Sequence, residues 1–195
     1  MTVTISRLYD SYWRAEQAVS KLKATGIPDA DISLIANRHV SAQHENVADG
    51  SSATGGAGVG AAVGGGAGLL AGIGLLAIPG LGPVVAAGWL AATAVGAIGG
   101  AAVGGLVGAL VNAGVPEADA HIYSESIRRG GTMVTVRTAD ANETTARGVL
   151  DSFAPVDVAT RRLEYQKTGW KTFDPAAPDY TLSDAELERA RRRDI

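Results

Sequence analysis

The sequence predicts an α+β domain that is divided by a glycine-rich helical hairpin. Strand and helix patterns alternate over residues 1–36 and again over residues 114–162. Between Asp49 and Glu117 the chain has no charged residue, and many glycines there recur every four positions. The alternating patterns predict a small sheet covered by helices. The uncharged segment predicts two helical arms inserted into that domain.

The first half of the domain, residues 1–36, is predicted to form a strand, a helix and a strand. Val3 and Ile5 alternate with polar residues, which is the period of a half-buried strand. Asp10 and Ser11 then supply N-cap chemistry for a helix. Its apolar positions recur at helical spacing and are Tyr12, Ala15, Ala18, Val19 and Leu22. Gly26 ends this helix, and a second strand follows over residues 31–35.

A polar linker over residues 37–56 leads into the uncharged segment. After that segment, a connecting helix is expected to begin beyond Pro116, because acidic residues at 117 and 119 favour a first helical turn. The chain then reads as a strand over Thr132–Arg137, with apolar and polar residues in alternation.

The end of the second half, residues 114–162, completes the predicted order of elements. Asp140 and Glu143 have the spacing of a capping box, which starts a helix through Phe153. Pro155 blocks its continuation, and a last strand is expected over Val156–Ala159. The order β-α-β, connecting helix, β-α-β is that of a ferredoxin-like sandwich, in which two helices cover one face of four antiparallel strands.

The inserted segment, residues 57–113, is predicted to be a glycine-zipper helical hairpin with arms at about 57–78 and 84–111. Residues four apart lie on one helix face, so each arm would have a groove that another helix can approach closely. The predicted packing and oligomerisation positions are Gly56, Gly60, Gly64, Gly68, Gly72, Gly88, Gly96, Gly100, Gly104 and Gly108. The predicted turn consists of Pro79, Gly80, Gly82 and Pro83.

The uncharged segment predicts a membrane anchor, with a soluble assembly as the alternative. At about 1.5 Å per residue the arms would be roughly 33 and 42 Å long, enough for a transmembrane helix in a lipid bilayer with both termini cytoplasmic. Against this, the first arm is poor in large apolar residues, and Trp89 is the only aromatic residue of the segment. The alternative is a soluble scaffold in the cytoplasm, a shell or filament with the hairpins buried between subunits. Both interpretations predict a homo-oligomer.

No enzymatic chemistry is predicted. The chain has no cysteine, which excludes disulfides and thiol catalysis, and its formal net charge of −3 gives no reason to expect nucleic acid as a partner. The glycines of 58–64 lack the preceding strand and following acid of a dinucleotide site, so no cofactor is predicted. His39, His44 and His121 do not have zinc-ligand spacing, so no metal is predicted.

The C-terminal tail, residues 163–195, contains Trp170, Phe173 and Tyr180, which are expected to dock on a neighbouring surface. Ser183 and Glu186 form a capping box for a short charged helix. That helix ends in a basic cluster consisting of Arg189, Arg191, Arg192 and Arg193. The cluster is suited to contact with an anionic surface, although arginines also favour a helix C-terminus.

Several segments in order resemble the bacterial general-stress, heat-induced proteins with a YflT-like domain. The resemblance rests on Leu8–Ser11, Ala15–Leu22, Gly26–Ile32, Ile78–Pro83, Gly114–Ala120, Arg128–Gly131 and Val134–Val136, and it covers roughly residues 3–158. It implies a non-enzymatic, stress-associated protein with a glycine-rich apolar middle. It supplies no catalytic residues.

Overall fold

The computed structural model describes residues 2–37, 74–78, 81–90, 93, 105–178 and 180–191. Its strands are β1 (Thr2–Tyr9), β2 (Ile32–Asn37), β3 (Gly74–Ile78), β4 (Gly82–Ala87) and β5 (Thr132–Ala139). Its α-helices are α1 (Tyr12–Ala24), α4 (Gly105–Asn112), α5 (Glu117–Arg128), α6 (Glu143–Asp151), α7 (Val158–Lys167) and α8 (Asp184–Arg191). Short 3-10 turns, η1 (Asp29–Asp31) and η4 (Asp140–Asn142), precede β2 and α6. The α+β class predicted from the sequence is confirmed.

The strands form one antiparallel sheet in the order β1-β5-β2-β4-β3. β5 lies between β1 and β2, so strands from before and after the uncharged segment pair directly with each other. The register places Ser6 opposite Thr135 and Ser33 opposite the same residue. The two sheet edges are therefore β1, near the N-terminus, and β3, from the uncharged segment.

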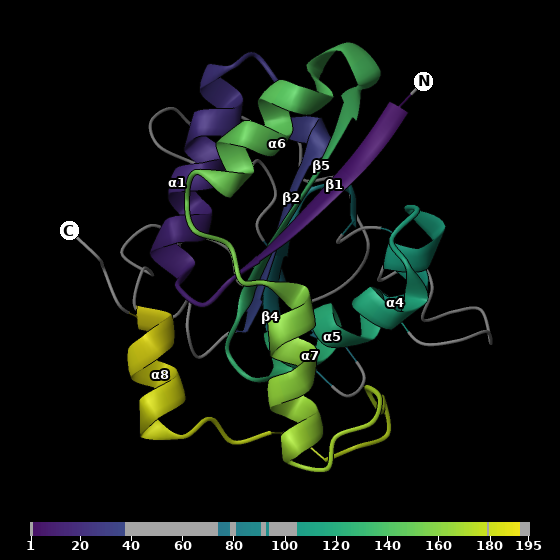
Figure 1. The fold of residues 1–195 in the computed structure, drawn as a ribbon, viewed down its shortest axis with the longest axis vertical. Helices are drawn as coiled ribbons and strands as arrows, with labels where there is room; N and C mark the ends of the chain where they lie inside the picture. Colours follow the sequence, from purple (N-terminus) through teal and green to yellow (C-terminus); the bar gives the residue numbers. More distant parts are fainter. Residues whose placement is uncertain are drawn as a thin grey trace.

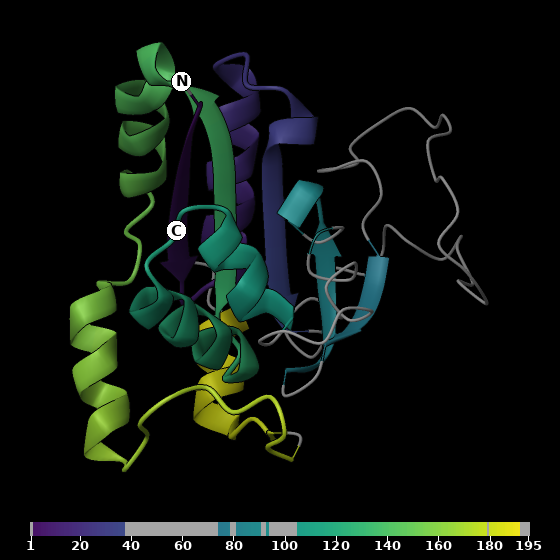
Figure 2. The same ribbon diagram turned by 90° about the vertical axis from the view of Figure 1, so that its right-hand side faces the viewer.

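Helices cover both faces of the sheet. Figure 1 shows α1 and α6 on one side of the strands and α4 and α5 on the other, and Figure 2 shows the same layers after a quarter turn. One buried cluster joins α1 and α6 to the sheet through Ile5, Val134 and Val136. The other joins α4 and α5 to the sheet through Leu8 and Met133. The predicted sandwich had helices on only one face, whereas here the connecting helix covers the second.

The predicted helical arms are wrong where the structure describes their ends near the turn. Residues 74–78 and 84–87 belong to β3 and β4, and β4 pairs with β2 as well as with β3. Both runs are short and apolar, a pattern that is ambiguous between strand and helix. Pairing of β4 with β2 and with β3 satisfies the backbone hydrogen bonds of β4. Part of the second arm is helical, as α4.

The prediction of a membrane span is also wrong. No helix in the described ranges is long and apolar enough to cross a membrane. The described ends of the arms near the turn form a β-hairpin, and the described part of α4 has 8 residues. A transmembrane helix needs about 20.

The last predicted strand is replaced by the start of a helix. α7 begins at Val158, and the carboxylate of Asp157 accepts a hydrogen bond of 2.7 Å from the Thr160 N–H. This N-cap outweighs the strand preference of the two flanking valines. One bond to the sheet remains, because the Val156 N–H donates to the Leu8 carbonyl at 2.7 Å.

Candidate functional site

The β3 edge of the sheet is the candidate functional site. β3 pairs with β4 on one side, and no described strand pairs with its other side. The sequence of β3 is Gly-Leu-Leu-Ala-Ile, without charge or proline. Natural proteins usually protect a free edge with lysine, proline, a bulge or a covering element, because an unpaired edge is a template for another strand.

Gly88 fixes the β3–β4 hairpin to the rest of the sheet. Its φ of +92° lies in the left-handed region, and an added Cβ would overlap the Ile32 carbonyl oxygen and lie 2.8 Å from Ser33 Cα. Just beyond it, the Leu90 N–H donates to Ser33 Oγ at 2.9 Å. The end of β4 therefore approaches β2 so closely that only glycine fits. Sequence reasoning placed Gly88 in a helix groove, whereas the structure gives it a different role.

The opposite edge, at β1, is closed by side chains and by one backbone bond. The Ser6 carbonyl accepts hydrogen bonds from Arg7 Nη1 at 3.0 Å and from the Tyr123 hydroxyl at 3.3 Å. The Leu8 carbonyl, two residues further on and therefore on the same edge, accepts from Val156 N–H. Arg7 also pairs with Asp151 at 2.6 Å. A second strand cannot pair here without displacing these contacts.

Burial raises the pKa of Tyr123 to about 12, although the nearby Arg7 partly opposes the shift. The phenol is therefore protonated at neutral pH, so that it can donate to the Ser6 carbonyl. This hydroxyl is part of what closes the β1 edge.

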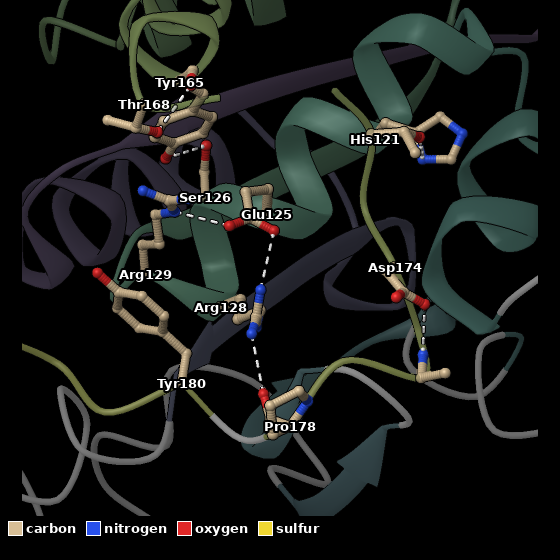
Figure 3. Close-up of polar contacts among 12 residues, drawn as sticks. His121, Glu125, Ser126, Arg128, Arg129, Tyr165, Thr168, Asp174, Pro178 and Tyr180 are labelled. Carbon is tan, nitrogen blue, oxygen red and sulfur yellow. Dashed lines mark hydrogen bonds and ion pairs between the residues drawn. The ribbon is translucent and has the colours of Figure 1, made fainter. Parts of the chain in front are cut away.

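A buried ionic cluster holds the C-terminal tail against the domain, as Figure 3 shows. Glu125 is fully buried on α5 and pairs with Arg129 at 2.6 Å and with Arg128 at 3.4 Å. The guanidinium of Arg129 lies 4.5 Å from the ring centroid of Tyr165 and 5.4 Å from that of Tyr180. Arg128 Nη2 also donates to the Pro178 carbonyl at 2.9 Å. Burial of this carboxylate depends on both arginines.

The tail aromatics lie on this chain's own domain. Phe173 is 4% exposed and belongs to the cluster on the α5 side, where Trp170 also packs. Tyr180 packs against the cluster on the α1 side, and its hydroxyl donates to Glu186 at 2.8 Å. The tail thus contacts the cores on both faces of the sheet.

Some of the remaining predicted positions lie among the described residues, and others lie outside them. Gly108 lies in α4, and Gly82 and Pro83 begin β4. Arg189 and Arg191 lie in α8. Outside the described residues are Gly56, Gly60, Gly64, Gly68, Gly72, Gly96, Gly100, Gly104, Pro79, Gly80, Arg192, Arg193, His39 and His44. The third histidine, His121, lies on α5 with its Nδ1 3.1 Å from Thr172 Oγ1.

Sequence reasoning missed the charged side chains that join distant elements. Arg161 is 7% exposed, and its Nη2 contacts both carboxylate oxygens of Asp10 at 2.8 Å. Arg162 pairs with Asp119 at 2.6 Å. For Glu125, the arginines three and four residues later were a usable signal, because that spacing brings side chains together on a helix. The Arg161–Asp10 and Arg162–Asp119 pairs join residues far apart in the sequence, so no local spacing predicts them.

Comparisons with known proteins give no match for the chain. No protein-family model, curated protein or solved structure matches it. The resemblance to the general-stress proteins therefore stays a prediction.

Proposed function

We propose that this chain is a non-enzymatic protein that self-assembles by pairing its β3 edge with the β3 edge of a second copy. The observation that supports it is the uncharged strand β3, whose outer side pairs with no described strand. This is the soluble-scaffold interpretation in a more specific form, with a β-edge in place of helix grooves. The family resemblance adds the expectation of a stress-associated role.

A second copy is the favoured occupant because the edge is self-complementary. Antiparallel pairing about the middle residue, Leu76, sets Leu75 of one copy opposite Ala77 of the other. No charge opposes this pairing, since residues 50–116 carry none. The pairing would join two five-stranded sheets, each with a ferredoxin-like core of β1, β5 and β2.

A closed dimer is favoured over a filament. A filament would need the β3 edge of one copy to pair with the β1 edge of the next, in a head-to-tail arrangement. The contacts of Arg7, Tyr123 and Val156 occupy the β1 edge and oppose this pairing. Pairing of β3 with β3 is two-fold symmetric and leaves no free β3 edge.

The test is the solution mass of the full chain, measured by light scattering after size-exclusion chromatography. We expect a dimer for the natural chain and a monomer for Leu76→Lys, because the symmetric pair would set two ammonium groups opposite each other. The dissociation constant of the dimer should rise at least about tenfold, which corresponds to a loss of about 1.4 kcal/mol in binding free energy. The control is Leu163→Lys, which adds the same charge at a side chain that is 59% exposed on α7.

Amide hydrogen exchange provides a second measurement. Residues 74–78 should exchange more slowly as protein concentration rises, whereas the amides of β1 should not change. A natural chain that is monomeric at every concentration, or a Leu76→Lys variant that still dimerises, would contradict the proposal. Growth of particle mass without limit would contradict the closed dimer.

A further inference from the structure

Two cavities of the molecule share one lining residue, Arg162. One has a volume of about 400 Å³ and lies among the start of α5, α7 and the residues after α7. The other has a volume of about 510 Å³ and lies among β1, α5, the end of α6 and the start of α7. Both volumes are within the range of small-molecule sites, roughly 300–1,000 Å³. Neither the buried ionic cluster around Glu125 nor the β3 edge lines either cavity.

The first cavity, which we call the cationic cavity, is rich in donors. Its walls carry Arg162, Lys171 and Gln166, against one carboxylate, that of Glu117. Among the described residues no carboxylate forms an ion pair with Lys171. The first turn of α5 also faces this cavity through Glu117 and Ala118, and no side chain caps that turn. Glu117 and Asp119 in that turn offset the positive end of the helix dipole, so the positive charge of this cavity comes from Arg162 and Lys171.

The second cavity, which we call the acidic cavity, has the opposite balance of charge. Three carboxylates, Asp119, Asp151 and Asp157, line it together with the guanidinium groups of Arg7 and Arg162. The N–H of Thr160 lowers the pKa of Asp157, so that this carboxylate is ionised at neutral pH. Its wall also includes Pro155 and the start of α7.

Arg162, which lines both cavities, has hydrogen-bond donors that no described residue accepts. Its Nη2 bonds to Asp119 at 2.6 Å, and no described residue accepts from its Nε or Nη1. Arg7, by contrast, uses Nε and Nη2 on Asp151 and Nη1 on the Ser6 carbonyl. A ligand anion can therefore bind Arg162 without breaking an existing contact, whereas Arg7 is already occupied.

We propose that the two cavities form one site for a small zwitterion with separated charges. Its carboxylate lies between Lys171 and Arg162 in the cationic cavity. Its ammonium group lies among Asp119, Asp151 and Asp157 in the acidic cavity. The opposite charge of the two cavities carries this assignment, because a simple anion or a simple cation would satisfy only one of them.

The test measures binding to the full chain by isothermal titration calorimetry. The probes are the ω-amino acids γ-aminobutyrate, δ-aminovalerate and ε-aminocaproate, which differ in the separation of their two charges. Butyrate and butylammonium carry one charge each and serve as comparisons. We expect saturable binding of at least one ω-amino acid, at least about tenfold tighter than either single-charge compound.

Two variants locate the site, and a third is the control. Arg162→Gln and Asp119→Asn should each weaken binding of the zwitterion at least about tenfold. Arg147→Gln removes an ion pair of similar exposure, Arg147–Glu143 on α6, outside both cavities, and should leave binding unchanged. Circular dichroism checks that each variant is folded. The proposal is overturned if no ω-amino acid binds, if butyrate binds as tightly as γ-aminobutyrate, or if only Arg147→Gln weakens binding.

Discussion

The two edges of the sheet differ in whether groups from elsewhere hydrogen-bond to the outward backbone carbonyls. At β1, side chains from α5 and from the strand itself occupy the Ser6 carbonyl, and the loop before α7 occupies the Leu8 carbonyl. At β3, the described residues offer no such contact, and the strand has no charge. Both edges lie in one sheet, so fold class alone does not explain the difference. One edge is built to stay unpaired, and the other is suited to pairing.

The difference follows from the sequences of the two edge strands. β1 carries Arg7, whose guanidinium reaches both the strand edge and Asp151 on α6. β3 consists of glycine and aliphatic residues only, which cannot donate to a carbonyl. An edge of that composition depends on groups from other elements for its protection.

The largest expected effect comes from detaching the β3 side with Gly88→Ala. A left-handed alanine costs about 1–2 kcal/mol. The overlap with Ile32 and Ser33 costs about 1–3 kcal/mol more. We therefore expect a loss of about 3 kcal/mol in the free energy of unfolding, together with loss of the dimer. Urea unfolding and light scattering measure the two effects.

Gly114→Ala is the matched control for this change. Gly114 has nearly the same φ, +91°, but an added Cβ would meet nothing within 4 Å. It should show only the backbone strain of about 1–2 kcal/mol and keep the dimer. Equal losses in the two variants would mean that the close approach of β4 to β2 contributes nothing to stability.

Local patterns in the sequence were sufficient for most of the domain. The alternation of Val3 and Ile5 predicted β1, and the run Thr132–Arg137 predicted β5. The helical spacing from Tyr12 to Leu22 predicted α1, and all five of its apolar positions are buried. In α1 the period of the apolar residues matches the element that forms, because one face of the helix packs on the core.

The β3–β4 hairpin was missed because its stability is not local. A glycine every fourth residue fits a helix groove, but short apolar runs such as 74–78 are ambiguous between strand and helix. The choice depends on β2, which pairs with β4 although their partner residues, such as Leu34 and Ala87, are about 50 positions apart. The two cavities were missed for a related reason, since Arg7, Asp119, Asp151 and Arg162 come from four different elements.

An intermediate loss in the free energy of unfolding is expected at alkaline pH, where Tyr123 on the β1 edge ionises. The folded pKa of Tyr123, about 12, lies above the ordinary value of 10.0. Because the raised pKa favours the neutral phenol, its contribution is complete below about pH 10 and is lost as the pH rises to about 12. The loss is on the order of 2 kcal/mol.

Comparison of the natural chain with Tyr123→Phe isolates this contribution. The phenylalanine variant should lose less free energy of unfolding between about pH 9 and about pH 11, because it has no phenol to ionise. Burial also raises the pKa of Tyr9 and Tyr12, but both residues are present in the two proteins and cancel in the difference. Identical pH slopes in urea unfolding would show that the Tyr123 hydroxyl does not stabilise the β1 edge.

The smallest effect is expected for Arg7→Gln, which removes a charge from the closed edge. The Arg7–Asp151 pair is 23% and 46% exposed, so its loss should cost only about 0.5–1 kcal/mol. The matched control, Arg147→Gln on α6, removes a pair of 46% and 35% exposure and should cost about 0.3–0.5 kcal/mol. Neither change should alter the solution mass, because Val156 still occupies the Leu8 carbonyl. A rise in mass for Arg7→Gln alone would instead show that the guanidinium, and not the backbone bond, keeps β1 from pairing.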